Sequence, residues 1–131
     1  MKKNFIHLHL HSEYSISDSL IRIKDLIKES SDNNHPAVAI TDLNNIFSLV
    51  KFYKEAIKNG VKPIVGIEID LLNQDSKNCS SKVILLCKNM KGFHNLSNLI
   101  TDAYVNLGED NKFYVSKSEL ANKSDGLIAL S

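Results

Sequence analysis

The stretch "HPAVAITDLNNIFSLVKFYKEAIKNGVKPIVGIEIDLL", residues 35–72, decides the fold that this sequence predicts. It opens with a short continuous apolar run after a proline, which is typical of a buried parallel strand. Apolar residues then recur every three or four positions from 46 to 57, which predicts a helix, and Gly60 stands where a helix C-cap belongs. A second strand is predicted over residues 62–72. Strand, helix and strand in this order predict a right-handed βαβ unit in a parallel sheet.

The same alternation extends to both sides of this stretch. Upstream, residues 5–10 alternate like a strand, and apolar residues at helical spacing then predict a helix that ends near "SSDNN", residues 30–34. Downstream, the sequence predicts a strand over 82–89, a helix over 92–107, a short helix over 116–122 and a closing strand over 126–131. The predicted fold class is therefore α/β, with parallel strands alternating with helices.

The composition is ordinary for a soluble globular protein. The 131 residues are 43% hydrophobic and 24% charged, and the net charge is +1. This balance argues against nucleic-acid binding by these residues, since duplex-binding proteins of this size carry a basic excess. The longest strongly apolar run, residues 83–87, is too short to span a membrane. Two cysteines without zinc spacing complete the case for a reduced, cytoplasmic protein.

Three histidines, His7, His9 and His11, occupy alternate positions in "FIHLHLHSEYSISD", residues 5–18. Alternate side chains of a strand share one face, so the three imidazoles are expected to lie together. Ligands of parallel α/β folds gather at the carboxyl ends of strands, where "TDLNN" and Glu68 are also expected. Imidazoles with carboxylates suit zinc, manganese or iron in a hydrolytic site. The alternative is a polar strand whose histidines bind no metal.

Four blocks carry a resemblance to a known family. "FIHLHLHSEYSISD", "AVAITDLNNIFSLVKFY", "GVKPIVGIEI" and "ILLCKNMKGFHNLSNLI" together resemble the start of the bacterial replicative DNA polymerase III alpha subunit, its polymerase and histidinol phosphatase (PHP) domain. The resemblance implies a distorted (β/α)7 barrel, of which about five strands can be placed in this chain. Residues 1–131 are therefore expected to form a partial, incomplete PHP-type barrel, the N-terminal fragment of a larger polymerase chain.

The resemblance also implies a set of metal ligands. His9 and His11 match the family's paired histidines, Asp18 matches the acid that follows them, and Glu68 matches the acid of the third strand. Two positions depart from the family: Leu43 stands where the metal-binding version has the histidine of a T-D-H motif, and Lys82 replaces a histidine that opens the fourth strand. Leucine has no lone pair, and a lysine ammonium repels a cation. The expected site is degenerate, with zinc or manganese bound weakly or not at all, and no catalytic residue is expected in this fragment.

Three classes of function stay open. The first is a replicative DNA polymerase that uses magnesium at carboxylates downstream of this chain and contacts DNA there. In relatives with a degenerate site the PHP domain is structural and docks the proofreading exonuclease subunit of the replisome. The second class is a stand-alone metal-dependent PHP phosphoesterase, similar to histidinol phosphatase, against which Leu43 and Lys82 argue. The third is a pure interaction module. If the first class is correct, this fragment alone is expected to be inactive and so to act only as such a module.

Overall fold

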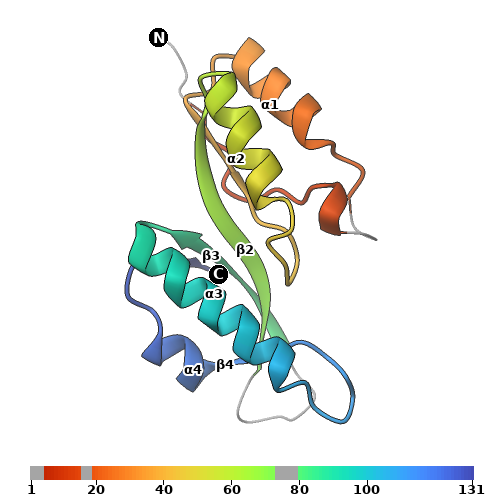
Figure 1. Ribbon diagram of the computed structural model, residues 1–131, viewed down its shortest axis with the longest axis vertical. Helices are drawn as coiled ribbons and strands as arrows, with labels where there is room; N and C mark the ends of the chain where they lie inside the picture. The colour runs from red at the N-terminus through yellow and green to blue at the C-terminus, as the bar shows by residue number, and fades with distance from the viewer. Residues whose placement is uncertain (1–4, 16–18, 73–79) are drawn as a thin grey trace. The chain divides into compact units, whose positions relative to one another are not determined.

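The computed structural model describes residues 5–15, 19–72 and 80–131, and the chain divides into two compact units, Met1–Ile67 and Glu68–Ser131 (Figure 1). Both units combine helices with strands, which confirms the α/β fold class. Among the described residues, every helix is too short or too polar to cross a membrane.

The first unit packs two helices against a parallel pair of strands. Its elements are the 3-10 helix η1 (Glu13–Ser15), α1 (Ile23–Asp32), β1 (Ala37–Ile40), α2 (Leu49–Lys58) and the first part of β2 (Lys62–Leu72). Ala37 lies opposite Lys62 and Ile40 opposite Val65 in a parallel register, which confirms the predicted strand–helix–strand unit. Figure 1 shows α1 and α2 side by side. The core of this unit consists of Ile23, Ile27, Val38, Ile40, Phe52, Ala56 and Val61.

Helix α2 ends as the sequence predicts and begins three residues later. Gly60 follows the C-cap residue Asn59 with a φ of 71°, the left-handed conformation in which glycine commonly ends a helix. At the other end, the side chain of Asn45 accepts a hydrogen bond from the Phe47 amide at 3.2 Å. This side-chain bond holds a turn ahead of the helix, so the apolar spacing that starts at residue 46 does not mark the first helical turn.

The prediction of a strand over residues 5–10 is wrong. This stretch belongs to what we call the histidine segment, residues 5–12, which runs beside β1. The amides of Ala39 and Thr41 donate to the carbonyl oxygens of His7 and Leu10 at 2.9 and 2.8 Å. The Leu10 amide, however, donates to the Thr41 side-chain oxygen Oγ1 at 3.1 Å instead of to a backbone carbonyl. A side chain thus replaces one backbone group of the ladder, and the segment stays extended without regular strand pairing.

The second unit contains the rest of β2 and a mixed sheet. Its other elements are β3 (Ser80–Cys87), α3 (Met90–Val105), β4 (Val115–Ser116), α4 (Lys117–Asn122) and β5 (Leu127–Leu130). In the sheet β3 lies between β2 and β5, and β4 pairs with β2. The sequence predicts α3, α4, β3 and β5 within a few residues. It does not predict β4, since two residues are too few to show a period.

Strand β5 runs antiparallel to β3, with Ile84 opposite Leu130 and Cys87 opposite Leu127. The expectation of parallel strands throughout is therefore wrong for this pair. A parallel neighbour is usually reached through a single crossover helix, whereas between β3 and β5 the chain forms α3, β4 and α4 and arrives in the opposite direction. Strand β4 is parallel to β2. The closure of a seven-stranded barrel stays a prediction.

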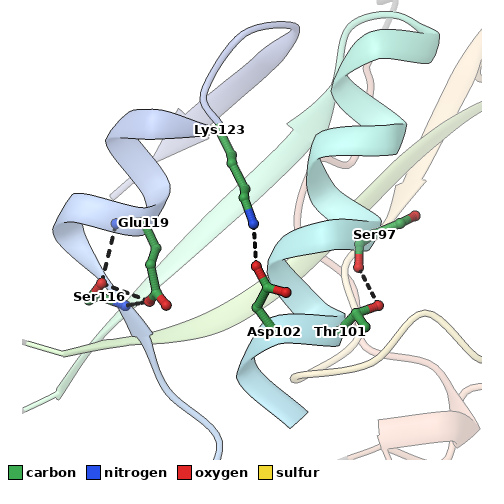
Figure 2. A network of polar contacts seen from close by, with 6 residues as sticks. All are labelled: Ser97, Thr101, Asp102, Ser116, Glu119 and Lys123. Carbon is green, nitrogen blue, oxygen red and sulfur yellow. Dashed lines mark hydrogen bonds and ion pairs between the residues drawn. The ribbon is translucent and has the colours of Figure 1, made fainter. Parts of the chain in front are cut away.

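Polar contacts fix the ends and positions of the helices in this unit (Figure 2). Ser116 and Glu119 form a capping box at the start of α4: the Ser116 Oγ accepts from the Glu119 amide at 3.2 Å, and Glu119 Oε2 accepts from the Ser116 amide at 2.9 Å. The Ser116 hydroxyl also donates to Glu119 Oε2 at 2.7 Å, and this bond, together with the one from the Ser116 amide, lowers the pKa of the Glu119 carboxyl. Lys123, just after α4, pairs with Asp102 on α3 and so ties the two helices together.

The backbone at Gly92, in the first turn of α3, approaches the turn before β5 closely. A Cβ atom placed on Gly92 would lie 1.9 Å from the carbonyl oxygen of Gly126. The Gly92 amide donates to the N-cap side chain of Asn89 at 2.9 Å. Only glycine fits at this crossing.

Candidate metal site and its supporting network

His9 and His11 lie together at the end of the histidine segment. Their ring centroids are 5.3 Å apart with an interplanar angle of 78°, and each ring offers a nitrogen within 4.8 Å of the other's. His9 is exposed and His11 is half-buried. Two imidazole nitrogens at this separation can serve as ligands to one divalent cation with small side-chain adjustments.

His7 takes part in a different contact. Its ring lies 4.6 Å from that of Phe5 and 5.8 Å from that of His35, in edge-to-face arrangements. The expected row of three imidazoles assumed a regular strand, and the histidine segment is not one. Within the described residues, the Nδ1 atom of His35 is buried without a hydrogen-bond partner.

The buried carboxylate of Asp42 anchors the chain that follows His11. Asp42 is 1% exposed and lies two residues after β1. Its Oδ1 accepts hydrogen bonds from the Ser12 amide at 2.6 Å and from the Ser15 hydroxyl at 2.9 Å, and its Oδ2 accepts from the Ser12 hydroxyl at 2.8 Å. We call Asp42, Ser12 and Ser15 the Asp42 network. It ties the carboxyl end of β1 to the turn beside the paired histidines.

The two serine hydroxyls also accept hydrogen bonds from backbone amides. Ser15 Oγ accepts from the Leu43 amide at 3.1 Å, and Ser12 Oγ accepts from the Tyr14 amide at 3.2 Å. Each hydroxyl therefore both donates and accepts, as a buried hydroxyl must to avoid a desolvation penalty. The turn is shaped by bonds within the chain.

The site residues expected from the sequence do not include the serines of this network, and they include Asp42 only as part of "TDLNN" at the carboxyl end of a strand. The structure shows Asp42 bonded to the turn at residues 12–15. A usable signal was the acid itself, because a carboxylate directly after a buried strand needs hydrogen-bond donors. Two serines spaced three apart after the histidines supply them.

Three further positions that the sequence analysis singles out, Glu68, Leu43 and Lys82, lie within the described residues. Glu68 is buried in β2, at 5% exposure. Leu43 is half-buried and contributes no ligand atom, and Lys82 is exposed on β3. Asp18 lies outside the described residues.

The family to which this chain belongs follows from comparison with known proteins. The family model of the PHP domain matches residues 7–131. The chain belongs to the PHP domain family.

Relatives that match nearly the whole chain include polymerase subunits. The chain is 42% identical over 131 residues to DNA polymerase III subunit alpha of Pseudomonas fluorescens, and 41% identical over 128 residues to that of Buchnera aphidicola subsp. Acyrthosiphon pisum. These matches cover 100% and 97% of this chain and 11% of each relative. The chain thus spans about one ninth of the length of the curated relatives that it matches.

Two solved structures share the fold. An amidohydrolase from Chromobacterium violaceum, with bound sulfate and no metal, matches with a TM-score of 0.58 at 18% identity, over 76% of this chain and 33% of that one. A candidate metal-dependent phosphoesterase from Bifidobacterium adolescentis matches with a TM-score of 0.55 at 16% identity, over 78% of this chain and 33% of that one. At these identities the likeness shows the fold alone.

Proposed function

We propose that this chain is part of the PHP domain of a DNA polymerase III alpha subunit, and that the parent protein carries out template-directed DNA replication in the cytoplasm. The observation that carries the proposal is similarity over nearly the whole chain, at 36–42% identity, to alpha subunits from several bacteria. In the parent protein, magnesium and the catalytic carboxylates belong to a site outside these residues. DNA binding is also assigned to the parent, because a net charge of +1 gives this segment little attraction for phosphates.

Within that parent, the proposed role of the domain is to support the polymerase and to dock the proofreading exonuclease subunit in the replisome. The Asp42 network supports a structural role, since it holds the histidine segment through hydrogen bonds from Ser12 and Ser15. Leu43 supports it as well, because no lone pair is present where the metal-binding version of the family has a histidine.

We further propose that the metal site is degenerate. His9, His11 and Glu68 are the candidate ligands, with Asp18 as a fourth, and they would hold at most one zinc or manganese ion weakly. Imidazole and carboxylate suit both ions. Leucine at 43 and lysine at 82 remove ligands that a multinuclear site requires, and firm binding of an ion depends on ligand number.

The mass of the native gene product tests the polymerase assignment. An antibody raised against these residues is expected to detect a species many times heavier than 14.7 kDa. A native product near 14.7 kDa would refute it. Co-purification of the exonuclease subunit with the full-length protein tests the docking role, and its absence under low-salt conditions would count against that role.

Metal analysis after exhaustive dialysis tests the degenerate site. We expect less than one tightly held ion per chain, and a His9→Ala/His11→Ala double variant should lose any zinc that titrates into the unaltered protein. His94→Ala, at an exposed histidine on α3, is the matched control and should bind as before. Two or more tightly held ions per chain would contradict the proposal.

A second candidate function is that of a metal-dependent phosphoesterase, which the retained pair His9 and His11 favours. Two imidazoles can hold an ion that activates water for attack on a phosphate ester. Hydrolysis of p-nitrophenyl phosphate in the presence of Mn²⁺ or Zn²⁺ distinguishes the two. We expect none; turnover that His9→Ala abolishes and His94→Ala retains would favour the esterase.

A further inference from the structure

Helix α2 presents a second apolar face to solvent. Phe47, Val50, Tyr53 and Ile57 are 68%, 63%, 52% and 56% exposed, and we call them the α2 stripe. They follow one another at three- and four-residue steps, so they form one row along the helix and the turn before it. The stripe is distinct from the core face of α2, where Phe52 and Ala56 are buried.

A row of this kind is more than the usual scatter of surface apolar groups. Single exposed apolar residues are common, whereas contiguous ones mark places where proteins interact. A surface helix ordinarily carries polar side chains opposite its core face. From Val50 to Ile57 the row extends about 10 Å along the helix axis, or two turns, which is the length over which a docked helix presents three anchors.

Lysines border the stripe along one side only. At 100° per residue, Lys54 and Lys58 follow Val50 around the helix, and Lys51 comes next. Lys51 is already engaged, since its ammonium pairs with Glu13 at 2.8 Å and lies 5.6 Å from the centre of the Tyr14 ring. Lys54 and Lys58 are exposed. They give the edge of the stripe a positive charge that a partner with acidic side chains would complement.

We propose that the α2 stripe docks an amphipathic helix of a separate protein, one with apolar residues at three- and four-residue spacing and aspartates or glutamates along one edge. This inference rests on the proposed docking role and adds to it the surface and the chemistry of the partner. Burial against Val50, Tyr53 and Ile57 supplies affinity, and acids opposite Lys54 and Lys58 orient the helix and speed its association. A second copy of α2 fits poorly, since Glu55 is its one acid against three lysines.

Photo-crosslinking in the purified complex of full-length polymerase and proofreading exonuclease tests the surface. The probe is Tyr53→p-benzoylphenylalanine, and the matched control carries the same group at Tyr104, a 45% exposed tyrosine on α3. We expect an adduct from position 53 to an acid-edged amphipathic segment of the exonuclease, and none from position 104. An adduct to a second polymerase copy or to another domain of the same chain would overturn the proposal, as would no adduct at position 53. If the unaltered complex does not form, the docking role itself fails; if it forms and position 53 stays uncrosslinked, only the surface is wrong.

Binding measurements on variants provide the second arm. Val50→Asp/Ile57→Asp should weaken exonuclease binding at least ~10-fold, while Val105→Asp, at a 76% exposed site on α3, should leave it unchanged. Lys54→Glu/Lys58→Glu should slow association several-fold at low salt, and reversing the crosslinked acids of the partner to lysine should restore it. Unchanged affinity of the Val50→Asp/Ile57→Asp variant, with a native circular dichroism spectrum, would overturn the proposal.

Discussion

Replacing Asp42 by alanine should release the histidine segment from β1. The substitution removes the acceptor of three hydrogen bonds, from the Ser12 amide and from the hydroxyls of Ser12 and Ser15. The hydroxyls can rotate toward other acceptors, but the Ser12 amide is fixed and loses its partner inside the protein. A buried donor left unpaired costs about 1–3 kcal/mol, and the two weakened hydroxyl bonds add about 0.5–1.5 kcal/mol each. We therefore expect Asp42→Ala to destabilise the segment by about 3 kcal/mol.

Hydrogen exchange followed by mass spectrometry measures this release directly in the full-length protein. A loss of about 3 kcal/mol corresponds to amide exchange about 100-fold faster in peptides that cover the histidine segment. Asp42→Asn keeps an oxygen for the Ser12 amide and should cost only about 1 kcal/mol. Asp25→Ala, at an exposed acid on α1, serves as the control and should leave the exchange as it was. Unchanged exchange in the Asp42→Ala protein would refute the view that this carboxylate holds the segment.

Two further predictions concern the second unit. Gly92→Ala should destabilise it by about 3 kcal/mol or more, because the added methyl group collides with the Gly126 carbonyl oxygen. Gly60→Ala has open space around it and should cost only about 1 kcal/mol, for its positive φ. Urea denaturation compares the free energies of unfolding of the two variants, and equal losses would contradict the close contact at Gly92. Burial raises the pKa of the Cys87 thiol to about 11 from an ordinary 9.0, so the thiol stays protonated up to about pH 11 in the folded protein. The unfolded chain releases this proton from about pH 9 upward. Above about pH 9 the thiol therefore lowers the free energy of unfolding. In a Cys79→Ser background, alkylation of Cys87 by iodoacetamide at pH 8 should therefore run about 100-fold slower in native protein than in urea, and equal rates would contradict the shift.

The elements that the sequence predicts best are those whose signal is local. The strand–helix–strand unit of β1, α2 and β2 is confirmed by the structure. Its apolar periods, and Gly60 just after the end of α2, all lie within a stretch of 38 residues, so the signal for this unit is local. The failure over residues 5–10 has a distant cause, since the Thr41 hydroxyl that replaces a backbone acceptor lies 31 residues from Leu10. The direction of β5 could not be predicted either, because alternation along a strand is the same whichever way its neighbour runs.

In the candidate site, too, local features could be predicted from the sequence and long-range contacts could not. Spacing alone indicates that His9 and His11 belong together, and the structure places their rings in contact. The roles of Ser12 and Ser15 depend on a carboxylate 30 and 27 residues away, and no period along the chain reports such a contact. Their bonds become visible only once β1 and the histidine segment lie side by side.

The Asp42 network has a consequence for how this part of the protein tolerates change. The atoms that shape the turn, the Asp42 carboxylate and the Ser12 and Ser15 hydroxyls, are different from the imidazole nitrogens that would bind an ion. A substitution of a histidine that would bind an ion can therefore leave the hydrogen bonds that shape the turn unchanged. Under the degenerate site proposed above, a replacement at a ligand position, such as leucine at 43, would lower ion affinity without removing a bond on which the turn depends, because position 43 contributes only its backbone amide to the Asp42 network.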